Sequence, residues 1–165
     1  MASKKKKGVG PGGKPPAAGD VATNRRARHK FKFLETMEAG IELKGSEVKS
    51  LRDGKAQINE SYAVVNDGEM WLRGAHIPPY APAAQANHDP DRPRKLLLHR
   101  REIERLIGKT AEKGLTLVPT RLYFKGPHAK VELALATSKE GRDRRREIAK
   151  RDVEREVARD YKQKL

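Results

Sequence analysis

Histidines are the side chains of this sequence best suited to acid–base or metal chemistry, so their spacing is informative. The chain has five, and none is paired at i, i+4 or in an HExxH arrangement: His29, His76, His88, His99 and His128. Cysteine is absent, which excludes a thiolate nucleophile, a disulfide scaffold and a sulfur-bound zinc ion. No GxSxG or complete Walker A motif occurs. The residues therefore predict no catalytic site, no metal and no cofactor, and we expect a protein that is not an enzyme.

The charge of the chain is strongly positive and concentrated at its two ends. The formal net charge is +15. Residues 1–30 hold nine basic residues and one acidic residue, residues 138–165 hold 11 and seven, and the stretch between them is nearly balanced. This excess predicts a polyanionic partner, with nucleic acid first and an anionic membrane surface second. No apolar run approaches the roughly 20 residues of a membrane span, and the N-terminus does not resemble a secretory signal. We expect a cytoplasmic protein without a membrane partner.

Composition divides the chain into three segments. Residues 1–23 combine the Lys4–Lys7 run with a stretch rich in Gly, Pro and Ala, which predicts disorder because little apolar surface can be buried. Residues 24–137 hold nearly all the large apolar side chains, enough for one folded domain. Residues 138–165 carry one thin apolar stripe on a charged helical pattern, which predicts a tail that becomes helical on binding. No self-complementary apolar patch is readable, so we expect a monomer.

The middle segment has strand and hairpin patterns that predict a small barrel. Two hairpins are indicated, each by two strand-like runs around a turn: residues 61–65 and 70–75 around Asn66-Asp67-Gly68, and residues 115–124 and 129–136 around Gly126-Pro127. Ile41 and Leu43 alternate with charged residues, as in a half-buried strand. About six short strands with two to three helices predict a mainly β fold, an oligonucleotide-binding-type (OB-like) β-barrel.

Two helices and one long loop are expected beside these strands. Ser46 is suited to cap a short helix that ends before Gly54. A second helix is expected over about residues 99–113, with Gly114 ending it. Residues 77–95 contain five prolines and predict a long loop, and loops of that length are often functional.

Several sequence blocks resemble one known family. They run in chain order from about residue 24 to the C-terminus: Asn24-Arg25-Arg26-Ala27-Arg28-His29, Glu38-Ala39-Gly40, Gly45-Ser46-Glu47-Val48-Lys49-Ser50-Leu51-Arg52, Asn87-His88-Asp89-Pro90, Arg94-Lys95-Leu96-Leu97-Leu98-His99, Leu117-Val118-Pro119, Asp143-Arg144-Arg145 and Lys150-Arg151-Asp152. With these blocks the chain resembles the SsrA-binding proteins (small protein B). Residues 1–23 lie outside the resemblance.

The resemblance implies an RNA-binding protein of trans-translation. Members of the family bind the tRNA-like domain of tmRNA (SsrA RNA), and with elongation factor Tu (EF-Tu) and GTP they deliver the alanyl-charged RNA to a stalled 70S ribosome. The protein body takes the place of the missing anticodon arm at the decoding centre. The tail enters the empty, rRNA-lined mRNA channel and becomes helical there. The nascent peptide is tagged for degradation and the ribosome is rescued. The family fold is an OB-type barrel with helices, in agreement with the strand pattern.

The resemblance also assigns residues to two RNA-facing groups. The RNA-binding group consists of Asn24, Arg26, Arg28, His29, Glu38, Lys49, Arg52, Leu97 and Lys130, and the resemblance does not divide its contacts between tmRNA and rRNA. The ribosome-binding group in the tail consists of Lys139, Arg142, Asp143, Arg144, Arg145, Arg146, Lys150 and Arg151. Basic side chains suit phosphates, whereas Asn24 and His29 are expected to reach base edges or to stack. Glu38 is expected to accept from base amino groups or to pair with an arginine, and Leu97 to support the packing.

The tail departs from the family pattern, and other functions remain open. Ser138-Lys139-Glu140 stands where the family usually has Gly-Lys-Lys, and Arg142 stands where an aromatic residue or histidine is frequent. Gly141 can supply flexibility, and an arginine guanidinium can also stack. The alternatives are a general rRNA-binding protein with the same barrel, a small RNA-processing enzyme that uses His29, and a membrane-surface protein bound through Lys4–Lys7.

Overall fold

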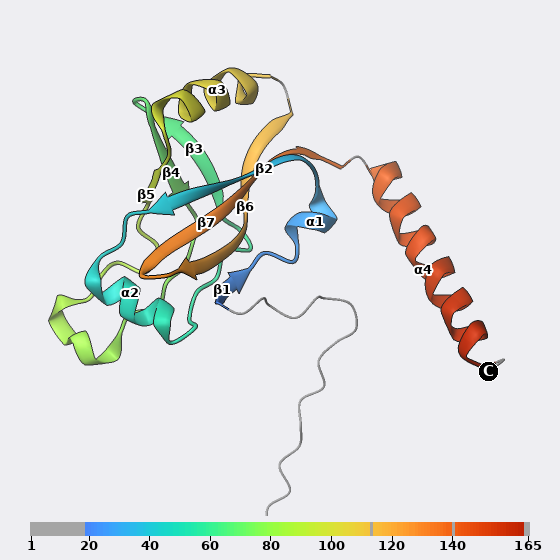
Figure 1. The fold of residues 1–165 in the computed structure, drawn as a ribbon, viewed down its shortest axis with the longest axis horizontal. Helices are drawn as coiled ribbons and strands as arrows, with labels where there is room; N and C mark the ends of the chain where they lie inside the picture. The colour runs from blue at the N-terminus through green and yellow to red at the C-terminus, as the bar shows by residue number, and fades with distance from the viewer. Residues whose placement is uncertain (1–18, 113, 140, 164–165) are drawn as a thin grey trace, which may run out of the picture.

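The folded part of the chain is built around a β-sheet, and helices lie at the edges of this sheet. The computed structural model describes residues 19–112, 114–139 and 141–163. The strands in these ranges are β1 (Asp20–Thr23), β2 (Phe31–Ile41), β3 (Tyr62–Asn66), β4 (Glu69–Arg73), β5 (Arg94–Leu97), β6 (Leu115–Lys125) and β7 (His128–Ser138). The helices are α1 (Ala27–Lys30), α2 (Gly45–Arg52), the 3-10 segment η1 (Ala81–Ala86), α3 (Arg100–Thr110) and α4 (Gly141–Gln163). Figure 1 shows α2 and α3 at opposite ends of the sheet and α4 projecting away from it.

The sheet closes on itself. Its strand order is β1-β6-β3-β4-β5-β2-β7, and β6 also pairs with β7. The six strands from β2 to β7 therefore form a closed circuit in which every pairing is antiparallel. Closure removes the unpaired edges that an open sheet would expose. The predicted OB-like barrel of about six strands is confirmed.

Both predicted hairpins are present, and the first has the expected turn geometry. Asp67 and Gly68 join β3 to β4 with φ values of 52° and 73°, as a type I′ turn requires at both central positions. The strand predicted at Ile41 and Leu43 differs in extent, because β2 is 11 residues long and ends at Ile41. Beyond Ile41 the chain leaves the sheet to enter α2, whose N-cap is Lys44.

The N-terminal boundary of the folded domain differs from the sequence prediction. Disorder is predicted for residues 1–23, but Asp20–Thr23 form β1, so the prediction is wrong for these four residues. β1 pairs with β6, where Arg121 Nη1 lies 3.1 Å from Asp20 Oδ1. Val21 and Ala22 also pack against the core. The short segment is ordered by partners about 100 residues away, which composition does not reveal. Residues 1–18 lie outside the described residues.

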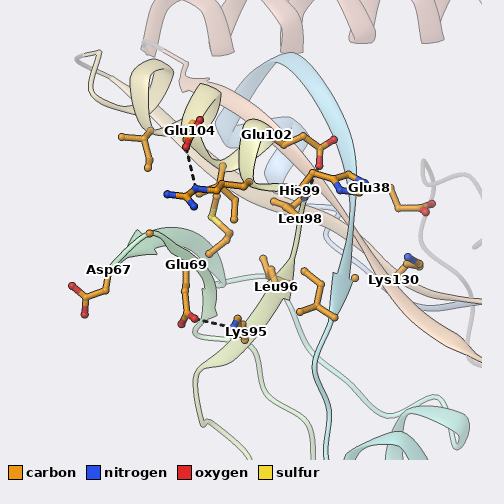
Figure 2. A pocket seen from close by; sticks show the side chains of 17 residues that line it. Glu38, Asp67, Glu69, Lys95, Leu96, Leu98, His99, Glu102, Glu104 and Lys130 are labelled. Atoms are coloured by element: carbon orange, nitrogen blue, oxygen red, sulfur yellow. Dashed lines mark hydrogen bonds and ion pairs between the residues drawn. The ribbon is translucent and has the colours of Figure 1, made fainter.

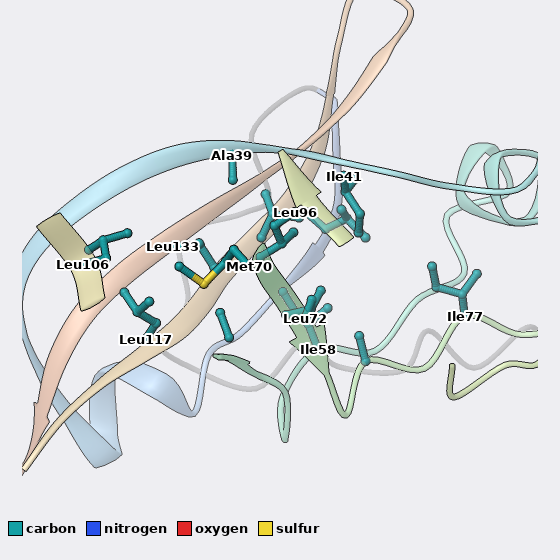
Figure 3. Packing of buried hydrophobic residues seen from close by; sticks show 14 of the residues in the cluster. Ala39, Ile41, Ile58, Met70, Leu72, Ile77, Leu96, Leu106, Leu117 and Leu133 are labelled. Carbon is teal, nitrogen blue, oxygen red and sulfur yellow. The ribbon is translucent and has the colours of Figure 1, made fainter. Parts of the chain in front are cut away.

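One hydrophobic cluster fills the barrel. Met70, Leu72 and Leu133 are buried at its centre, where inward-facing side chains of several strands meet (Figure 3). Helix α3 covers one end with Leu106, which is fully buried. Ile107 follows Leu106 and is equally apolar, but it is 42% exposed. The helix therefore contributes a narrower apolar face than its sequence suggests.

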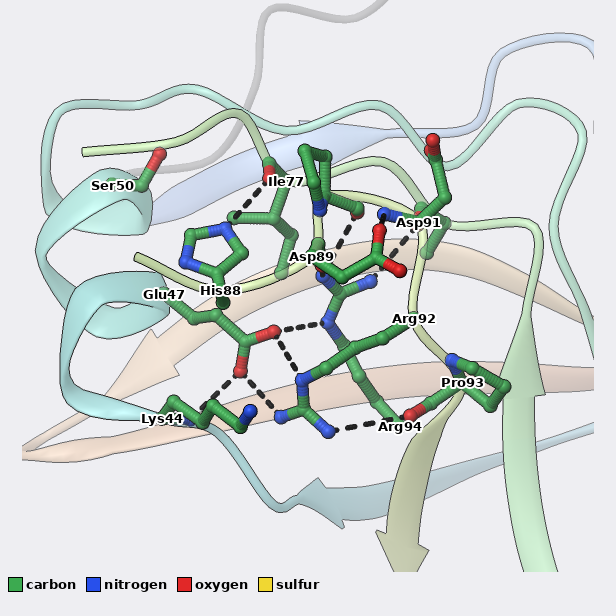
Figure 4. Close-up of polar contacts among 12 residues, drawn as sticks. Lys44, Glu47, Ser50, Ile77, His88, Asp89, Asp91, Arg92, Pro93 and Arg94 are labelled. Atoms are coloured by element: carbon green, nitrogen blue, oxygen red, sulfur yellow. Dashed lines mark hydrogen bonds and ion pairs between the residues drawn. The ribbon is translucent and has the colours of Figure 1, made fainter. Parts of the chain in front are cut away.

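Helix α2 is fixed to the barrel by a buried carboxylate. Glu47 is fully buried and accepts hydrogen bonds from Arg94 Nε at 2.8 Å and from Arg92 Nε and Nη2 at 2.7 and 2.6 Å (Figure 4). The backbone N–H of Lys44 donates to the same carboxylate at 2.7 Å, which caps the helix. Arg94 is also fully buried, and its Nη1 donates to Ala75 O at 2.9 Å. These bonds tie the loop between β4 and β5 to α2.

The charge of Glu47 is maintained by its partners. Burial alone would raise the pKa of Glu47, but hydrogen bonds from Arg92, from the Lys44 backbone and from Arg94 outweigh burial and lower the pKa. The carboxylate is therefore ionised at neutral pH. Breaking one side of such a buried pair leaves an uncompensated charge, which is strongly destabilising.

Ser46 has a different role from the predicted one. The sequence predicts Ser46 as the cap of α2, but Lys44 occupies the N-cap and Ser46 is buried inside the first turn. Its hydroxyl lies 2.8 Å from His88 Nδ1, and His88 Nε2 lies 2.8 Å from Ile77 O. Since a carbonyl only accepts, Nε2 carries the proton and Nδ1 accepts from Ser46. The proline-rich loop is thus ordered against α2 by a second set of buried bonds.

The C-terminal segment is helical in the chain by itself. The sequence predicts that it becomes helical on the ribosome, whereas α4 already spans Gly141–Gln163. Ion pairs between Lys139 and Glu147, at 2.5 Å, and between Asp152 and Arg155, at 3.7 Å, support this helix. The apolar stripe lies open, since Val153 and Val157 are 59% and 62% exposed.

Candidate nucleic-acid interface

Two rows of residues cross neighbouring strands on the barrel wall. The first row takes one residue from each of β1, β6, β7, β2 and β5: Asp20, Tyr123, Lys130, Gly40 and Leu97. The second row takes one residue from each of β6, β7 and β2: Arg121, Glu132 and Glu38. Adjacent strands lie about 4.8 Å apart, so Lys130 and Leu97, on either side of Gly40, are separated by about 10 Å. The barrel thereby brings Glu38, Leu97 and Lys130 of the predicted group together.

Glu38 is held by protein donors. The Tyr123 hydroxyl donates to Glu38 Oε2, and Lys125 Nζ lies 3.3 Å from Oε1. The hydrogen bond from Tyr123, followed by that from Lys125, lowers the pKa of Glu38 despite partial burial. Burial and the bond to Glu38 in turn raise the pKa of Tyr123 to about 12. Glu38 is therefore an ionised acceptor that fixes the hydroxyl of the buried Tyr123 and the ammonium of the exposed Lys125.

Leu97 differs from its predicted role. The sequence favours a packing residue, but the Leu97 side chain is 52% exposed. The backbone of Gly40 lies directly beneath it, and a Cβ at position 40 would come within 3.1 Å of Leu97 Cβ. Glycine at position 40 therefore leaves the space that Leu97 occupies. Lys130 lies across Gly40 from Leu97, half-buried, so an apolar side chain and a cation stand next to each other on an open surface.

Helix α2 adds two cations that lie against aromatic rings. The Arg52 guanidinium carbon is 5.0 Å from the centre of the Phe124 ring, and Lys49 Nζ is 5.7 Å from the centre of the Tyr80 ring. Phe124 also lines a groove of about 220 Å³, which extends to Leu97 and Lys130. Arg52 thus belongs to the same surface as the two rows, whereas the ring beside Lys49 belongs to the loop between β4 and β5. A cation stacked on an aromatic ring is suited to phosphates and bases.

A larger hollow of about 980 Å³ continues this surface toward α3. Figure 2 shows Glu38 and Lys130 at one edge of it and Asp67 and Glu69 at the other. Lys95 Nζ pairs with Glu69 Oε1 at 2.8 Å, which neutralises one of these acids. The charges are therefore mixed at both edges, since Lys130 lies near the ionised Glu38 at one edge and Lys95 is paired with Glu69 at the other.

Asn24 does not fit its predicted role. Its side chain is buried, and Nδ2 donates to Pro119 O at 2.9 Å and to Ile58 O at 3.3 Å. Its Oδ1 accepts from the backbone N–H of Ala27 at 3.1 Å, which supports the start of α1. The amide is thus fully used inside the protein. The prediction that Asn24 reaches a base edge is wrong, because the residue holds α1 on the barrel.

The other predicted residues of this segment lie on the surface of α1 or next to it. Arg26 Nη1 pairs with Glu60 Oε1 at 3.1 Å, and the Arg28 guanidinium carbon lies 5.9 Å from the centre of the Phe33 ring. His29 is exposed, and its Nδ1 lies 3.3 Å from Arg151 Nη1 of α4. Lys139 joins the same region, because its Nζ donates to Arg28 O at 2.8 Å. The sequence-distant tail and α1 therefore form one basic cluster.

The tail residues occupy successive turns of α4. Arg142, Asp143 and Arg144 lie on its first turn, and their side chains lie outside what the structure describes. The remaining basic residues of the predicted group on α4 are exposed: Arg145, Arg146, Lys150 and Arg151. Several turns of one helix thus present cations to the surroundings.

The α1 cluster and the barrel rows lie at opposite ends of β2. Helix α1 ends at Lys30, directly before the start of β2 (Figure 1). The residue rows cross β2 near its other end, at Glu38 and Gly40. At about 3.3 Å per residue, the nine steps from Phe31 to Gly40 cover roughly 30 Å. The predicted RNA-binding group is therefore divided between the α1 cluster at one end of β2 and the barrel rows with α2 at the other.

Sequence reasoning did not assign to the site three consecutive residues of β6 that lie in or next to the barrel rows. These residues are Tyr123, Phe124 and Lys125, at the end of β6. Tyr123 and Lys125 both contact Glu38, and the Phe124 ring contacts Arg52. The sequence feature that could have pointed to them is an aromatic pair followed by a lysine, directly before the turn at Gly126. Without the strand pairing, nothing placed them beside Glu38.

The described ranges hold neither a metal-binding cluster nor a membrane-spanning helix. Among residues 19–112, 114–139 and 141–163, no group of three or more His, Asp or Glu residues could hold a metal ion. In the same part of the chain no helix is both long and apolar enough to span a bilayer.

Comparison with known proteins finds one protein family and several of its members similar to this chain. The sequence profile of the family described as SmpB protein matches residues 21–163. An SsrA-binding protein of Mycobacterium sp. (strain KMS) is 59% identical over 140 residues, which cover 85% of this chain and 83% of the relative. An SsrA-binding protein of Desulforudis audaxviator is 58% identical over 139 residues, with 84% and 91% covered. A chain of the solved structure described as "tmRNA-SmpB: a journey to the center of the bacterial ribosome" is similar with a TM-score of 0.62 and 54% identity, covering 73% of this chain and 85% of that one.

Proposed function

Because the chain belongs to the SmpB protein family, we propose that it binds the tRNA-like domain of tmRNA on the outer wall of its barrel. The observation that carries this proposal is the convergence of Glu38, Leu97 and Lys130 across adjacent strands. These residues combine an apolar contact, a cation and a fixed acceptor on an open surface. Such a mixture suits the unpaired, structured parts of an RNA better than a uniform duplex.

Arg52 and Lys130 are the phosphate-binding members of this surface. Arg52 is exposed and oriented by the Phe124 ring, so little side-chain freedom is lost when it contacts RNA. Glu38 acts through Tyr123 and Lys125, because its carboxylate is already bonded to both. Recognition of the RNA thus depends on groups that the barrel fixes before binding.

The α1 cluster and α4 serve the ribosome. His29 and Arg151 lie together, and Lys139 connects the start of the tail to Arg28. We assign this cluster to rRNA near the decoding centre of the stalled 70S ribosome, and α4 to the empty mRNA channel. Its 23 residues make a helix about 35 Å long at 1.5 Å per residue. The exposed arginines and lysines of α4 suit a channel lined by rRNA phosphates.

The position of the two regions at opposite ends of β2 supports a bridging role. One end of the barrel holds tmRNA while the other faces the ribosome, so the protein takes the place of the missing anticodon arm. Alanyl-tmRNA then arrives with EF-Tu and GTP, and the nascent peptide is tagged for degradation. The protein acts in this scheme as a cytoplasmic monomer that supplies binding and position without catalysis.

Binding measurements at several fixed salt concentrations test the proposal. The tRNA-like domain of tmRNA is compared with a tRNA and with an unrelated structured RNA of equal length. We expect a preference for tmRNA of about a hundredfold, or roughly 2.7 kcal/mol. A tail variant with Arg145, Arg146, Lys150 and Arg151 changed to glutamine should bind more weakly and keep that preference.

Equal binding to all three RNAs, weakening in parallel as salt rises, would contradict the proposal. Charge alone would then account for binding, as in a general rRNA-binding protein. Loss of the preference in the tail variant would move recognition from the barrel to α4.

A further inference from the structure

The loop between β4 and β5 places an aromatic ring beside the proposed RNA-binding surface. Tyr80 directly precedes η1, which lies next to α2 in Figure 1, and Lys49 Nζ of α2 is 5.7 Å from the centre of the Tyr80 ring. Three residues further along α2, the Arg52 guanidinium carbon is 5.0 Å from the centre of the Phe124 ring. Residues at i and i+3 lie on one face of a helix, so Lys49 and Arg52 connect the loop to the barrel wall.

The two cations on this face of α2 are available to a polyanion. Lys49 and Arg52 are both exposed, and in the part of the chain that the structure describes neither has a carboxylate within ion-pair distance. On the other side of α2 the situation is different, because Arg92 and Arg94 are both paired with Glu47. The positive charge beside Tyr80 is therefore left for RNA phosphates, which attract unpaired lysines and arginines.

Tyr80 is held in place by the side chain of one asparagine. Asn87 Oδ1 accepts from the backbone N–H of Tyr80 at 2.8 Å, and Asn87 Nδ2 donates to Tyr80 O at 2.8 Å. The same Nδ2 donates to Ala84 O at 3.2 Å, and Ala84 has a φ of 46°, which side-chain-bearing residues rarely adopt. Asn87 thus closes the loop on itself and fixes the backbone from which the Tyr80 ring extends.

Both ends of this closed loop are attached to α2. Ser50 Oγ donates to Pro78 O at 2.8 Å at one end, and His88 is bonded to the Ser46 hydroxyl at the other, as Figure 4 shows for the positions of Ser50 and His88. Between these anchors, η1 contains no buried residue. The loop therefore adds nothing to the hydrophobic core, and its polar bonds serve to fix Tyr80 relative to α2.

We propose that Tyr80 is a further RNA-binding residue, on whose ring an unpaired base of the tRNA-like domain stacks while Lys49 contacts a neighbouring phosphate. Asn87 is the residue that positions this ring. The inference rests on the proposed function, because it takes the barrel wall and α2 as the side of the protein that meets tmRNA. Tyr80 is partly exposed, and single-stranded RNA offers base faces that stack on aromatic side chains beside a cation.

Removal of the ring separates stacking from the attraction of charge. Tyr80→Ala should lower the affinity for the tRNA-like domain at fixed salt about fivefold to 150-fold, the loss expected for one stacked base. Tyr80→Phe keeps the ring and should bind within about twofold of the original chain. The matched control is Tyr62→Ala, because Tyr62 is 43% exposed but lies on β3, outside α2 and the barrel rows, and its loss should leave the affinity unchanged. Equal losses in Tyr80→Ala and Tyr62→Ala, or no loss in Tyr80→Ala, would overturn the inference.

A double-mutant cycle tests whether Asn87 acts through Tyr80. Asn87→Ala should weaken binding of the tRNA-like domain about threefold or more, because the ring is then no longer fixed before the RNA binds. In the Tyr80→Ala background the same change should alter the affinity by less than about twofold, since no ring remains to be positioned. Equal losses in both backgrounds would refute the positioning role. Urea unfolding of each variant ensures that the affinities are compared where all are folded.

A proximity measurement gives an independent test of position. Since the chain has no cysteine, a single cysteine can carry a hydroxyl-radical-generating iron chelate at one chosen site. A chelate on Gln85→Cys, in η1, should cleave an unpaired stretch of the tRNA-like domain next to the nucleotides cleaved from Lys125→Cys. A chelate on Arg101→Cys, in α3 at the opposite end of the sheet from α2, should cleave elsewhere. Absence of cleavage from Gln85→Cys, or cleavage of the nucleotides that Arg101→Cys reaches, would overturn the inference.

The outcomes separate this inference from the proposed function. If Tyr80→Ala binds the tRNA-like domain as the original chain does, and the original chain prefers tmRNA, the inference is wrong and the proposed function stands. If Tyr80→Ala lowers the affinity for the 70S ribosome alone, the loop contacts the ribosome and the inference is again wrong. Absence of any preference for tmRNA in the original chain would instead refute the proposed function. A preference for tmRNA together with weaker binding by Tyr80→Ala is the result that supports both.

Discussion

Replacing Leu97 by alanine should weaken RNA binding while leaving the barrel nearly as stable as before. Its neighbour Leu96 provides a matched control, because the two leucines are adjacent in β5 and point to opposite faces. Leu96 is 1% exposed and Leu97 is 52% exposed. The same chemical change is thus made once in the core and once on the proposed interface.

The magnitudes follow from these exposures. Complete burial of a leucine side chain contributes about 1.5–3 kcal/mol, so covering the exposed half of Leu97 by RNA contributes about 0.8–1.6 kcal/mol. At 1.4 kcal/mol per tenfold, Leu97→Ala should lower RNA affinity about fourfold to fifteenfold. Its cost in folding stability should be about 1 kcal/mol or less. Leu96→Ala should cost about 2–5 kcal/mol of folding stability, because it opens a cavity in the core.

Two measurements on each variant decide the matter. Urea unfolding gives the change in the free energy of unfolding, and titration of the tRNA-like domain at fixed salt gives the change in affinity. The titration is made at a temperature where both variants are folded. The expected pattern is a crossover: Leu97→Ala binds weakly and is stable, whereas Leu96→Ala is unstable and binds nearly as well as the original protein when folded.

Two results would refute the reasoning. If Leu97→Ala destabilised the protein as much as Leu96→Ala, Leu97 would be the packing residue that the sequence suggested. If Leu97→Ala left the affinity unchanged, the barrel row would not be the RNA-binding surface at position 97.

Three further predictions concern the charges and packing around the interface. Glu47→Gln should lower the free energy of unfolding by about 3–5 kcal/mol at neutral pH, measured in urea. Because the pKa of Glu47 is lowered in the folded state, its stabilisation is complete above the unfolded-state pKa and is lost as pH falls through the folded-state value, so the variant should show a shallower acid dependence. Tyr123→Phe removes the hydroxyl that donates to Glu38 and should weaken RNA binding about threefold to tenfold in filter binding, with unchanged far-ultraviolet circular dichroism. Leu106→Ala should lower the free energy of unfolding by about 2–5 kcal/mol, and Ile107→Ala by about 1 kcal/mol or less, in thermal or urea unfolding. Equal losses in the two variants would contradict the conclusion that Leu106 is buried and Ile107 is not.

The fold was readable from the sequence wherever local patterns carry it. The Asn66-Asp67-Gly68 turn needs two left-handed residues in a row, and few sequences other than such pairs supply them. The alternation of Val131, Leu133 and Leu135 in β7 likewise placed one face of that strand in the core. Periodicity did not reveal β1, because its four residues owe their order to β6 and to Arg121.

The individual site residues were less predictable than the fold. Residue type suggests that a leucine is buried and an asparagine is exposed, but here Leu97 is exposed and Asn24 is buried. Leu97 follows Leu96 in a strand, so only one of the two can face the core. Asn24 is buried because backbone groups of Ile58, Pro119 and Ala27 satisfy its amide. The exposure of Leu97 and the burial of Asn24 both depend on residues distant in the sequence, so the sequence alone does not show them.

The sequence by itself determined the charge, the hairpins and the blocks that resemble one family. These properties reside in single residues or in neighbours along the chain, so they survive without a fold. The tertiary structure alone decided that Glu38, Leu97 and Lys130 meet and that β1 begins beside Phe124. It also decided that His29 meets Arg151 of the tail at the far end of β2. These contacts join residues tens of positions apart, and their register is fixed by closure of the barrel, which depends on all six strands at once.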